Sequence, residues 1–152
     1  MIRKGGAQDV PFLRDMLRHA YYARWASSEI PLSRYVEGWG RKGDAAVVAI
    51  EGFQPVGAAW YRLFPADEPG YGFVDEETPE LSVAVVPSMR GKGHGAELLE
   101  ALVERARVEG FTRLSLSVEP GSSQEQFYAR FGFEPVRPGV MVASPAAADG
   151  PR

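Results

Sequence analysis

Apolar side chains recur three and four residues apart in two stretches of the chain, which is the spacing of one face of an α-helix. The first helix is predicted at 10–20, and Asp9 before it is a suitable N-cap residue. The second is predicted from Ala96 to Gly110, because glycine commonly follows the last helical turn. A weaker pattern predicts another helix at 34–39.

Other stretches are continuous apolar runs or alternate apolar with polar positions, as strands do. A helix between two strands forms a β-α-β unit, so the strands on either side of the second helix should be parallel. The two strands before them are joined by a short turn, which predicts an antiparallel hairpin. Strands are predicted at 2–4, 45–50, 56–64, 81–86, 112–118, 133–136 and 140–143.

This order of elements predicts an α/β fold with a mixed, mostly antiparallel sheet flanked by helices. Ser122 and Glu125 form a capping-box pattern that begins one more short helix. The length of 152 residues is typical of a single domain, expected here at 1–143. The segment 144–152 lacks large apolar residues and is expected to be a disordered tail.

Composition narrows the class of function. The net charge of −3 gives no general attraction to nucleic acid or to an anionic membrane. The chain has no cysteine, which excludes disulfides, cysteine-ligated metal and a cysteine nucleophile. His19 has no partner at metal-ligand spacing, so no metal site is predicted. The sequence shows no apolar run long enough for a membrane span and no leader, so a soluble cytoplasmic protein is expected.

The glycine-rich stretch RGKGHG at 90–95 separates a predicted strand from a predicted helix. In that arrangement several backbone N–H groups and the positive end of the helix dipole face one spot. Glycine lets an anion approach those amides closely. Arg90 and Lys92 add positive charge. His94 is a further candidate for contacting the phosphate, although a solvent-facing side chain is favoured for it. The stretch therefore predicts a cradle for a pyrophosphate.

The same residues resemble a known family. Arg90, Gly93 and Gly95, preceded by 85–87, are similar to motif A of the GNAT family of N-acetyltransferases, whose loop holds the pyrophosphate of acetyl-coenzyme A. The segment 127–133 is similar to that family's motif B. Both motifs stand in the family's order, and the resemblance covers 1–143. It implies a sheet whose parallel strands, at 81–86 and 112–118, splay around the coenzyme.

The resemblance also implies roles for individual residues. Tyr128 becomes the general acid that protonates the leaving thiolate, and Glu80 the base that takes a proton from the acceptor amine. Backbone of the strand at 81–86 would pair with the pantetheine amides, and Ser122 would touch the pantetheine arm. The expected coenzyme-binding residues are Val83, Val85, Arg90, Gly91, Lys92, Gly93, His94, Gly95 and Ser122.

The implied reaction is direct transfer of acetyl to a primary amine of a small molecule or peptide, which the sequence does not identify. Asp75, Glu76 and Glu77 have two interpretations: they attract a cationic acceptor, or they form a solvated acidic loop. Relatives in the family often form dimers, so a homodimer is also an expectation. Aromatic residues that either line an acceptor pocket or belong to the core are Tyr21, Tyr22, Trp25, Trp60, Tyr61 and Tyr71.

Two alternatives remain open. The segment 121–124 departs from the family pattern, in which asparagine and a small residue are usual, so a coenzyme-binding sensor without turnover is one alternative. A nicotinamide-dependent oxidoreductase is the other, because Gly91, Gly93 and Ala96 fit the dinucleotide spacing. It is less favoured, since residues 87–90 separate the strand from the glycines.

Overall fold

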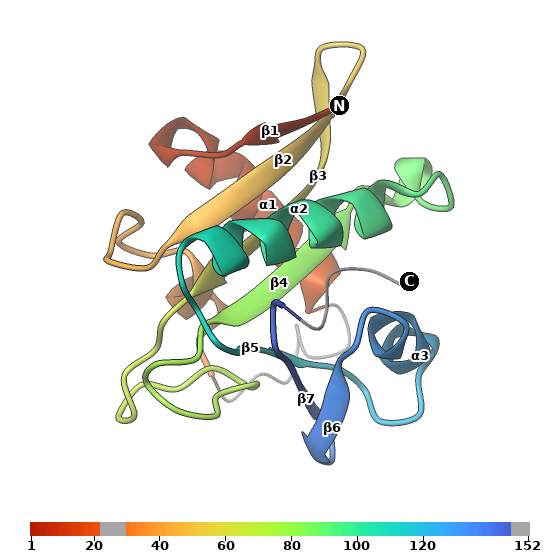
Figure 1. The fold of residues 1–152 in the computed structure, drawn as a ribbon. Helices are drawn as coiled ribbons and strands as arrows, with labels where there is room; N and C mark the ends of the chain where they lie inside the picture. The colour runs from red at the N-terminus through yellow and green to blue at the C-terminus, as the bar shows by residue number, and fades with distance from the viewer. Residues whose placement is uncertain (22–29, 147–152) are drawn as a thin grey trace. The chain divides into compact units, whose positions relative to one another are not determined.

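The structure is a computed structural model that describes residues 1–21 and 30–146 (Figure 1). Its elements are β1 (Ile2–Lys4), the 3₁₀ helix η1 (Ala7–Asp9), α1 (Val10–Ala20), η3 (Leu32–Tyr35), β2 (Ala45–Glu51), β3 (Gln54–Arg62), β4 (Glu80–Val85), η4 (Pro87–Met89), α2 (His94–Val108), β5 (Leu114–Ser117), α3 (Ser123–Ala129), β6 (Glu134–Arg137) and β7 (Val140–Ala143). Tyr22, Trp25 and the tail 147–152 lie outside the described residues.

The strands form a seven-stranded sheet in the order β1-β2-β3-β4-β5-β7-β6. The pairs β1–β2, β2–β3, β5–β7 and β6–β7 are antiparallel. β4 and β5 are parallel, with Glu80 opposite Ser115. The α/β class, the antiparallel majority and the parallel pair predicted from the sequence are all confirmed.

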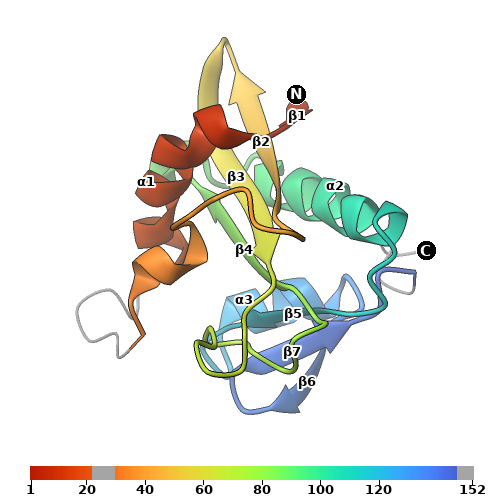
Figure 2. The ribbon, with the colours of Figure 1, turned by 90° about the vertical axis from the view of Figure 1, so that its left-hand side faces the viewer.

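The chain divides into two compact units, and the first comprises 1–62 and 82–102. In this unit α1 and the first part of α2 lie on opposite faces of the strands (Figures 1 and 2). Gly57 explains how close the strands come, because a Cβ there would lie 2.9 Å from the Ala84 carbonyl oxygen. The core side chains of the helices are Leu13, Met16, Leu17, Leu98, Leu99 and Leu102.

The second unit comprises 63–81 and 103–152. Its strands β5, β7 and β6 follow one another in the sheet, and its core includes Leu114, Leu116, Phe133 and Met141. The long loop before β4 packs tightly against β5, since a Cβ on Gly72 would lie 2.8 Å from the Leu116 carbonyl carbon.

Helix α2 ends as the sequence predicted but begins two residues earlier, at His94. Gly110 has a φ of 87° and donates to the Arg107 carbonyl, and the next residue, Phe111, donates to the Ala106 carbonyl. These are the two hydrogen bonds of a Schellman motif. Asp9 precedes α1 as predicted but makes no side-chain cap; its carboxylate instead binds Arg3 and the Gly6 N–H.

The helix predicted at 34–39 is wrong. The structure has only the 3₁₀ helix η3 (Leu32–Tyr35), followed by a turn. The backbone carbonyls of Arg34 and Glu37 accept hydrogen bonds from the Arg62 guanidinium. A long-range contact therefore overrides the local helical pattern.

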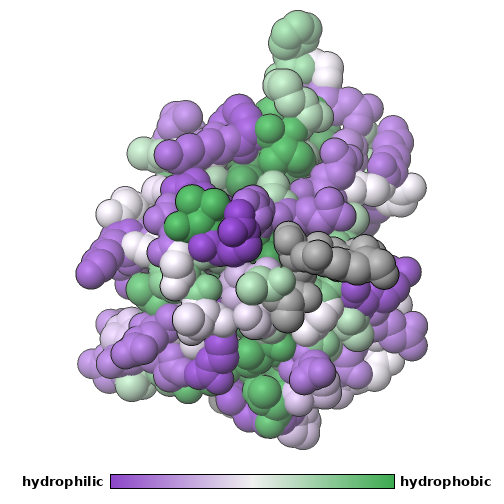
Figure 3. All heavy atoms as spheres, in the orientation of Figure 1, coloured by the Kyte–Doolittle hydropathy of each residue, from purple (hydrophilic) through white to green (hydrophobic). Residues whose placement is uncertain are grey.

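Hydrophilic side chains cover much of the face shown in Figure 3. The exposed residues of α2 include Glu97, Glu100 and Glu104. In the described part of the chain, no helix combines the length and the apolar character that crossing a membrane requires.

Candidate coenzyme and acyl-transfer site

The loop at 90–95 has the backbone geometry that an anion cradle needs. Gly91 and Gly93 have φ values of 81° and 87°, in the left-handed region that favours glycine. A Cβ at either position would meet nothing within 4 Å, so the loop surface is open. The Gly93 carbonyl accepts the Glu97 N–H, which places the first turn of α2 directly after the loop. The N–H groups of that turn have no intrahelical partner, so the loop and helix suit a diphosphate.

The cations of the loop are exposed, and one of them is tied to the strand before it. Arg90 donates from Nε to the Val85 carbonyl at 3.2 Å, while Lys92 Nζ lies 3.9 Å from the Met89 sulfur. The Arg90 side chain therefore folds back onto the end of β4. Val83 and Val85 are half-buried on that strand, where the family resemblance implies that the pantetheine arm binds.

The sequence favoured a solvent-facing His94, but the structure shows that this residue is buried. His94 is 8% exposed, and its Nε2 lies 2.9 Å from Oε2 of Glu51 at the end of β2. The imidazole is therefore buried and directed toward Glu51 at the end of β2.

Glu80 is a carboxylate held inside the protein. It is the first residue of β4 and 1% exposed. Its register partner Ser115 is 0% exposed, and the Ser115 Oγ has no hydrogen-bond partner among the described residues. Burying a carboxylate is costly, so such groups are often found where their chemistry is used. Ser115 alternates with Leu114 and Leu116 in the sequence, which is typical of a strand with one exposed face, but both faces of β5 are covered.

The acidic loop before β4 is bonded to its own surroundings. Asp75 forms an ion pair with Arg113, and Glu76 Oε2 accepts the Ala66 N–H at 2.7 Å. Burial works against the charged form of Asp75, but hydrogen bonds from Thr78 and Glu77, with the charge of Arg113, hold the pKa of its carboxyl below the ordinary value. Asp75 and Glu76 therefore both have partners within the same compact unit.

Tyr128 lies on α3 among aromatic rings. Its ring centroid is 5.2 Å from that of Phe127 and 5.8 Å from that of Phe133, both in edge-on arrangements. Burial raises the pKa of the Tyr128 phenol above its ordinary value. The hydroxyl therefore stays protonated and able to donate well above neutral pH. Ser122 is the N-cap of the same helix, and its Oγ accepts the Glu125 N–H at 3.3 Å, as its capping pattern predicted.

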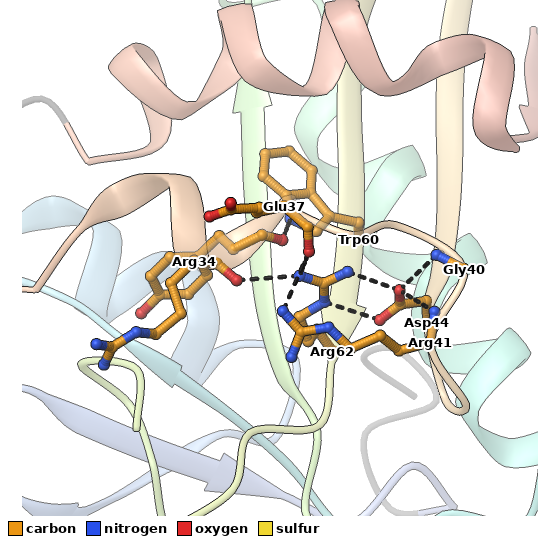
Figure 4. Close-up of polar contacts among 8 residues, drawn as sticks. Arg34, Glu37, Gly40, Arg41, Asp44, Trp60 and Arg62 are labelled. Atoms are coloured by element: carbon orange, nitrogen blue, oxygen red, sulfur yellow. Dashed lines mark hydrogen bonds and ion pairs between the residues drawn. The ribbon is translucent and has the colours of Figure 1, made fainter. Parts of the chain in front are cut away.

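A buried ion pair that sequence reasoning missed organises the segment before β2 (Figure 4). Arg62 is 1% exposed and donates from Nε and Nη2 to Asp44 at 2.9 and 2.7 Å. Its Nη1 donates to the carbonyls of Arg34 and Glu37, and its guanidinium lies 5.4 Å from the Trp39 ring centre. No local pattern could reveal this pair, because its partners are distant in the sequence.

The aromatic residues near α1 are mainly core residues. Tyr21 is buried, stacks at 4.6 Å on Tyr35, and its hydroxyl lies 2.6 Å from Ser82 Oγ on β4. Trp60 is buried and donates to the Tyr35 carbonyl. Tyr61 is also buried, so of the described candidates only Tyr71 is partly exposed.

The candidate residues fall into both compact units. Val83, Val85 and the loop 90–95 belong to the first unit, whereas Glu80, Ser122 and Tyr128 belong to the second. Within residues 1–21 and 30–146, no cluster of histidine, aspartate or glutamate could hold a metal ion.

Comparison with known proteins identifies the family. The sequence profile of the acetyltransferase (GNAT) family matches residues 10–133. An L-methionine sulfoximine/L-methionine sulfone acetyltransferase of Pseudomonas paraeruginosa is 31% identical over 140 residues, covering 88% of this chain and 79% of that protein. Its counterpart in Pseudomonas aeruginosa is 31% identical over 141 residues, with the same coverage.

Solved structures of acetyltransferases share this fold. The ribosomal-protein-alanine N-acetyltransferase of Brucella melitensis superposes with a TM-score of 0.71 and 27% identity, covering 95% of this chain and 99% of that one. A GNAT acetyltransferase of Brucella melitensis in complex with acetyl-CoA has a TM-score of 0.63 at 19% identity, covering 95% and 86%. This chain thus belongs to the acetyltransferase (GNAT) family and is an acetyl-coenzyme A-dependent N-acetyltransferase.

Proposed function

We propose that this enzyme transfers acetyl directly to the α-amine of a small amino acid whose side chain carries an oxidised sulfur, such as a sulfone or sulfoximine. The observation that carries the proposal is the 31% identity over 140 residues to an enzyme named for those two acceptors. The alignment covers 88% of this chain, so it includes the strand, loop and helix described above.

Acetyl-coenzyme A supplies the activated thioester, and the side chains of this chain manage two protons. Glu80 takes a proton from the acceptor ammonium or amine, directly or through water, because its carboxylate is held inside the protein at the start of β4. The C–N bond then forms as the C–S bond breaks. Tyr128, whose phenol stays protonated, donates its proton to the departing sulfur.

Coenzyme binding falls to β4 and the loop that follows it. The amides of Arg90 to Gly95 bind the diphosphate, and the exposed Arg90 and Lys92 add charge. The backbone of Val83 and Val85 pairs with the pantetheine arm, and the hydroxyl of Ser122 donates to it, since its oxygen already caps α3. The open loop surface and the positive φ of its glycines support this assignment.

The test is a thiol-release assay with acetyl-coenzyme A and a panel of amines. The panel holds L-methionine sulfone, L-methionine sulfoximine, L-methionine, a polyamine and a peptide with N-terminal alanine. We expect the sulfone and sulfoximine to be acetylated with a kcat/KM at least tenfold above that of the others. A preference for the alanine peptide would overturn the acceptor class, and coenzyme binding without thiol release on any amine would indicate a sensor.

A further inference from the structure

The β2–β3 hairpin places the carboxylate of Glu51 beside the first residue of α2. Glu51 is the last residue of β2 and pairs with Gln54 across the turn. The two turn residues, Gly52 and Phe53, have φ values of 57° and 69°. Positive φ at both central positions is the geometry of a type I′ turn, whose twist matches that of the strands. The position of Glu51 is therefore fixed by the sheet.

The partner of Glu51 is the first residue of α2. His94 Nε2 lies 2.9 Å from Glu51 Oε2, and the histidine side chain is 10% exposed while that of Glu51 is 48% exposed. A carboxylate only accepts hydrogen bonds, so Nε2 carries the hydrogen and donates it. The bond spans 43 residues of sequence and joins the hairpin to the helix end.

The loop that precedes His94 has few other attachments of its own. Arg90 to Gly93 are exposed, and no atom lies within 4 Å of a Cβ placed on Gly91 or Gly93. On the strand side, Arg90 Nε binds the Val85 carbonyl at 3.2 Å. On the helix side, the His94 ring is the first buried side chain after the loop, four residues before the core residue Leu98. Because glycines leave the backbone free to turn, the two ends determine where the loop amides point.

We propose that Glu51 and His94 are positioning residues for the coenzyme diphosphate. Their hydrogen bond sets the direction of the first turn of α2, and with it the N–H groups that bind the phosphate oxygens. Donors must be held within a fraction of an ångström to bind well, so a loose first turn weakens the diphosphate contact. This inference rests on the proposed function in one respect, namely that the loop 90–95 receives the diphosphate.

The pair also makes an electrostatic prediction. Without His94, the Glu51 carboxylate loses the donor that holds it against the helix end, so it can turn toward the loop and repel an incoming diphosphate. His94→Ala should therefore weaken coenzyme binding more than Glu51→Ala does. The double variant should bind better than His94→Ala alone, since it lacks the repelling charge.

The experiment measures calorimetric affinity for coenzyme A together with kcat/KM for two donors, acetyl-coenzyme A and S-acetylpantetheine. The second donor has the thioester and the pantetheine arm but no diphosphate. We expect Glu51→Ala to weaken coenzyme A binding about tenfold and to lower kcat/KM for acetyl-coenzyme A similarly, which is about 1.4 kcal/mol. The value for S-acetylpantetheine should stay within twofold of the wild type.

Two further variants separate positioning from folding. Glu51→Gln keeps an oxygen acceptor of the same reach and should restore affinity to within about threefold, since it preserves the hydrogen bond. Glu104→Ala removes an exposed ion pair with Arg107 on α2 and should leave kcat/KM for both donors unchanged. Thermal unfolding of each variant is recorded on the same samples.

The outcomes are distinct. Equal losses with both donors, or coenzyme affinity unchanged in Glu51→Ala and His94→Ala, would overturn the positioning role. If Glu51→Ala does not fold, a tenfold loss in Glu51→Gln with both donors would overturn it as well. Wild-type protein that binds no coenzyme A would instead refute the proposed function.

Discussion

The loop 90–95, which follows β4, and the loop 65–79, which precedes it, both contain glycines and charged residues. They differ in where their polar groups are directed. In the first loop the glycines have open space around them and the cations are exposed. In the second, Asp75 and Glu76 bind partners inside the same unit, and Gly72 presses against the backbone of β5.

Composition alone therefore does not distinguish a binding loop from a structural one. A loop that binds an anion keeps donors that no protein group uses, whereas a structural loop satisfies its own polar groups. Substitutions of the exposed cations Arg90 and Lys92 should change coenzyme affinity with little loss of stability. Substitutions in 65–79 should do the reverse.

The largest effect is expected in the structural loop, at Gly72→Ala. The new Cβ would lie 2.8 Å from the Leu116 carbonyl carbon and 3.0 Å from the Ser117 nitrogen, and backbone atoms cannot move aside cheaply. We expect a loss of about 2–3 kcal/mol in the free energy of unfolding, measured by urea denaturation. Gly6→Ala is the matched control, because its Cβ would meet only the flexible end of Gln8. Equal costs for the two variants would refute the tight packing.

The loop 90–95, which is proposed to bind the diphosphate, should give the converse result at Arg90→Ala. Loss of a charge-assisted contact should weaken coenzyme A binding by about 1.5–3 kcal/mol, with unfolding free energy nearly unchanged. The contribution should shrink as salt rises, because the guanidinium is exposed. Calorimetric titration at low and high salt measures both effects. Lys42→Ala, an exposed cation outside the loop, serves as control, and affinity unchanged in Arg90→Ala would remove this residue from the site.

A substitution at Tyr128 tests whether the second unit contributes the general acid. Tyr128→Phe removes only the hydroxyl and should lower kcat at least tenfold, about 1.4 kcal/mol in the barrier, with coenzyme affinity retained. Burial raises the pKa of the phenol, so the wild-type enzyme should keep its general acid through mildly alkaline pH. Steady-state rates from neutral pH to pH about 10.5, beyond the ordinary phenol pKa of about 10, check this, because an unshifted phenol would already be mostly ionised there. A kcat equal to wild type across that range would exclude the general-acid role.

The sequence predicted the features that are local in the chain. The strand, glycine loop and helix around 90–95 and the capping serine of α3 depend on neighbouring residues, so their patterns were sufficient. The contacts that sequence reasoning missed depend on long-range pairing. Glu51 lies 43 residues from His94, and Asp44 lies 18 residues from Arg62. The alternation around Ser115 suggested one exposed face, and only the folded sheet shows that both are covered.

The smallest effect is expected at Asp75, where the structural loop meets solvent. Its folded-state pKa lies below the ordinary value, so its ion pair and hydrogen bonds stabilise the protein above the unfolded pKa of about 3.9. That contribution is lost as pH falls through the lower folded-state value. Because the pair with Arg113 is 41–45% exposed, Asp75→Asn should cost less than about 1 kcal/mol at neutral pH. Urea denaturation from pH about 7 down to pH about 3 should show the two proteins converging in the acid range. A constant difference across that range would mean that the carboxylate charge of Asp75 does not hold the loop.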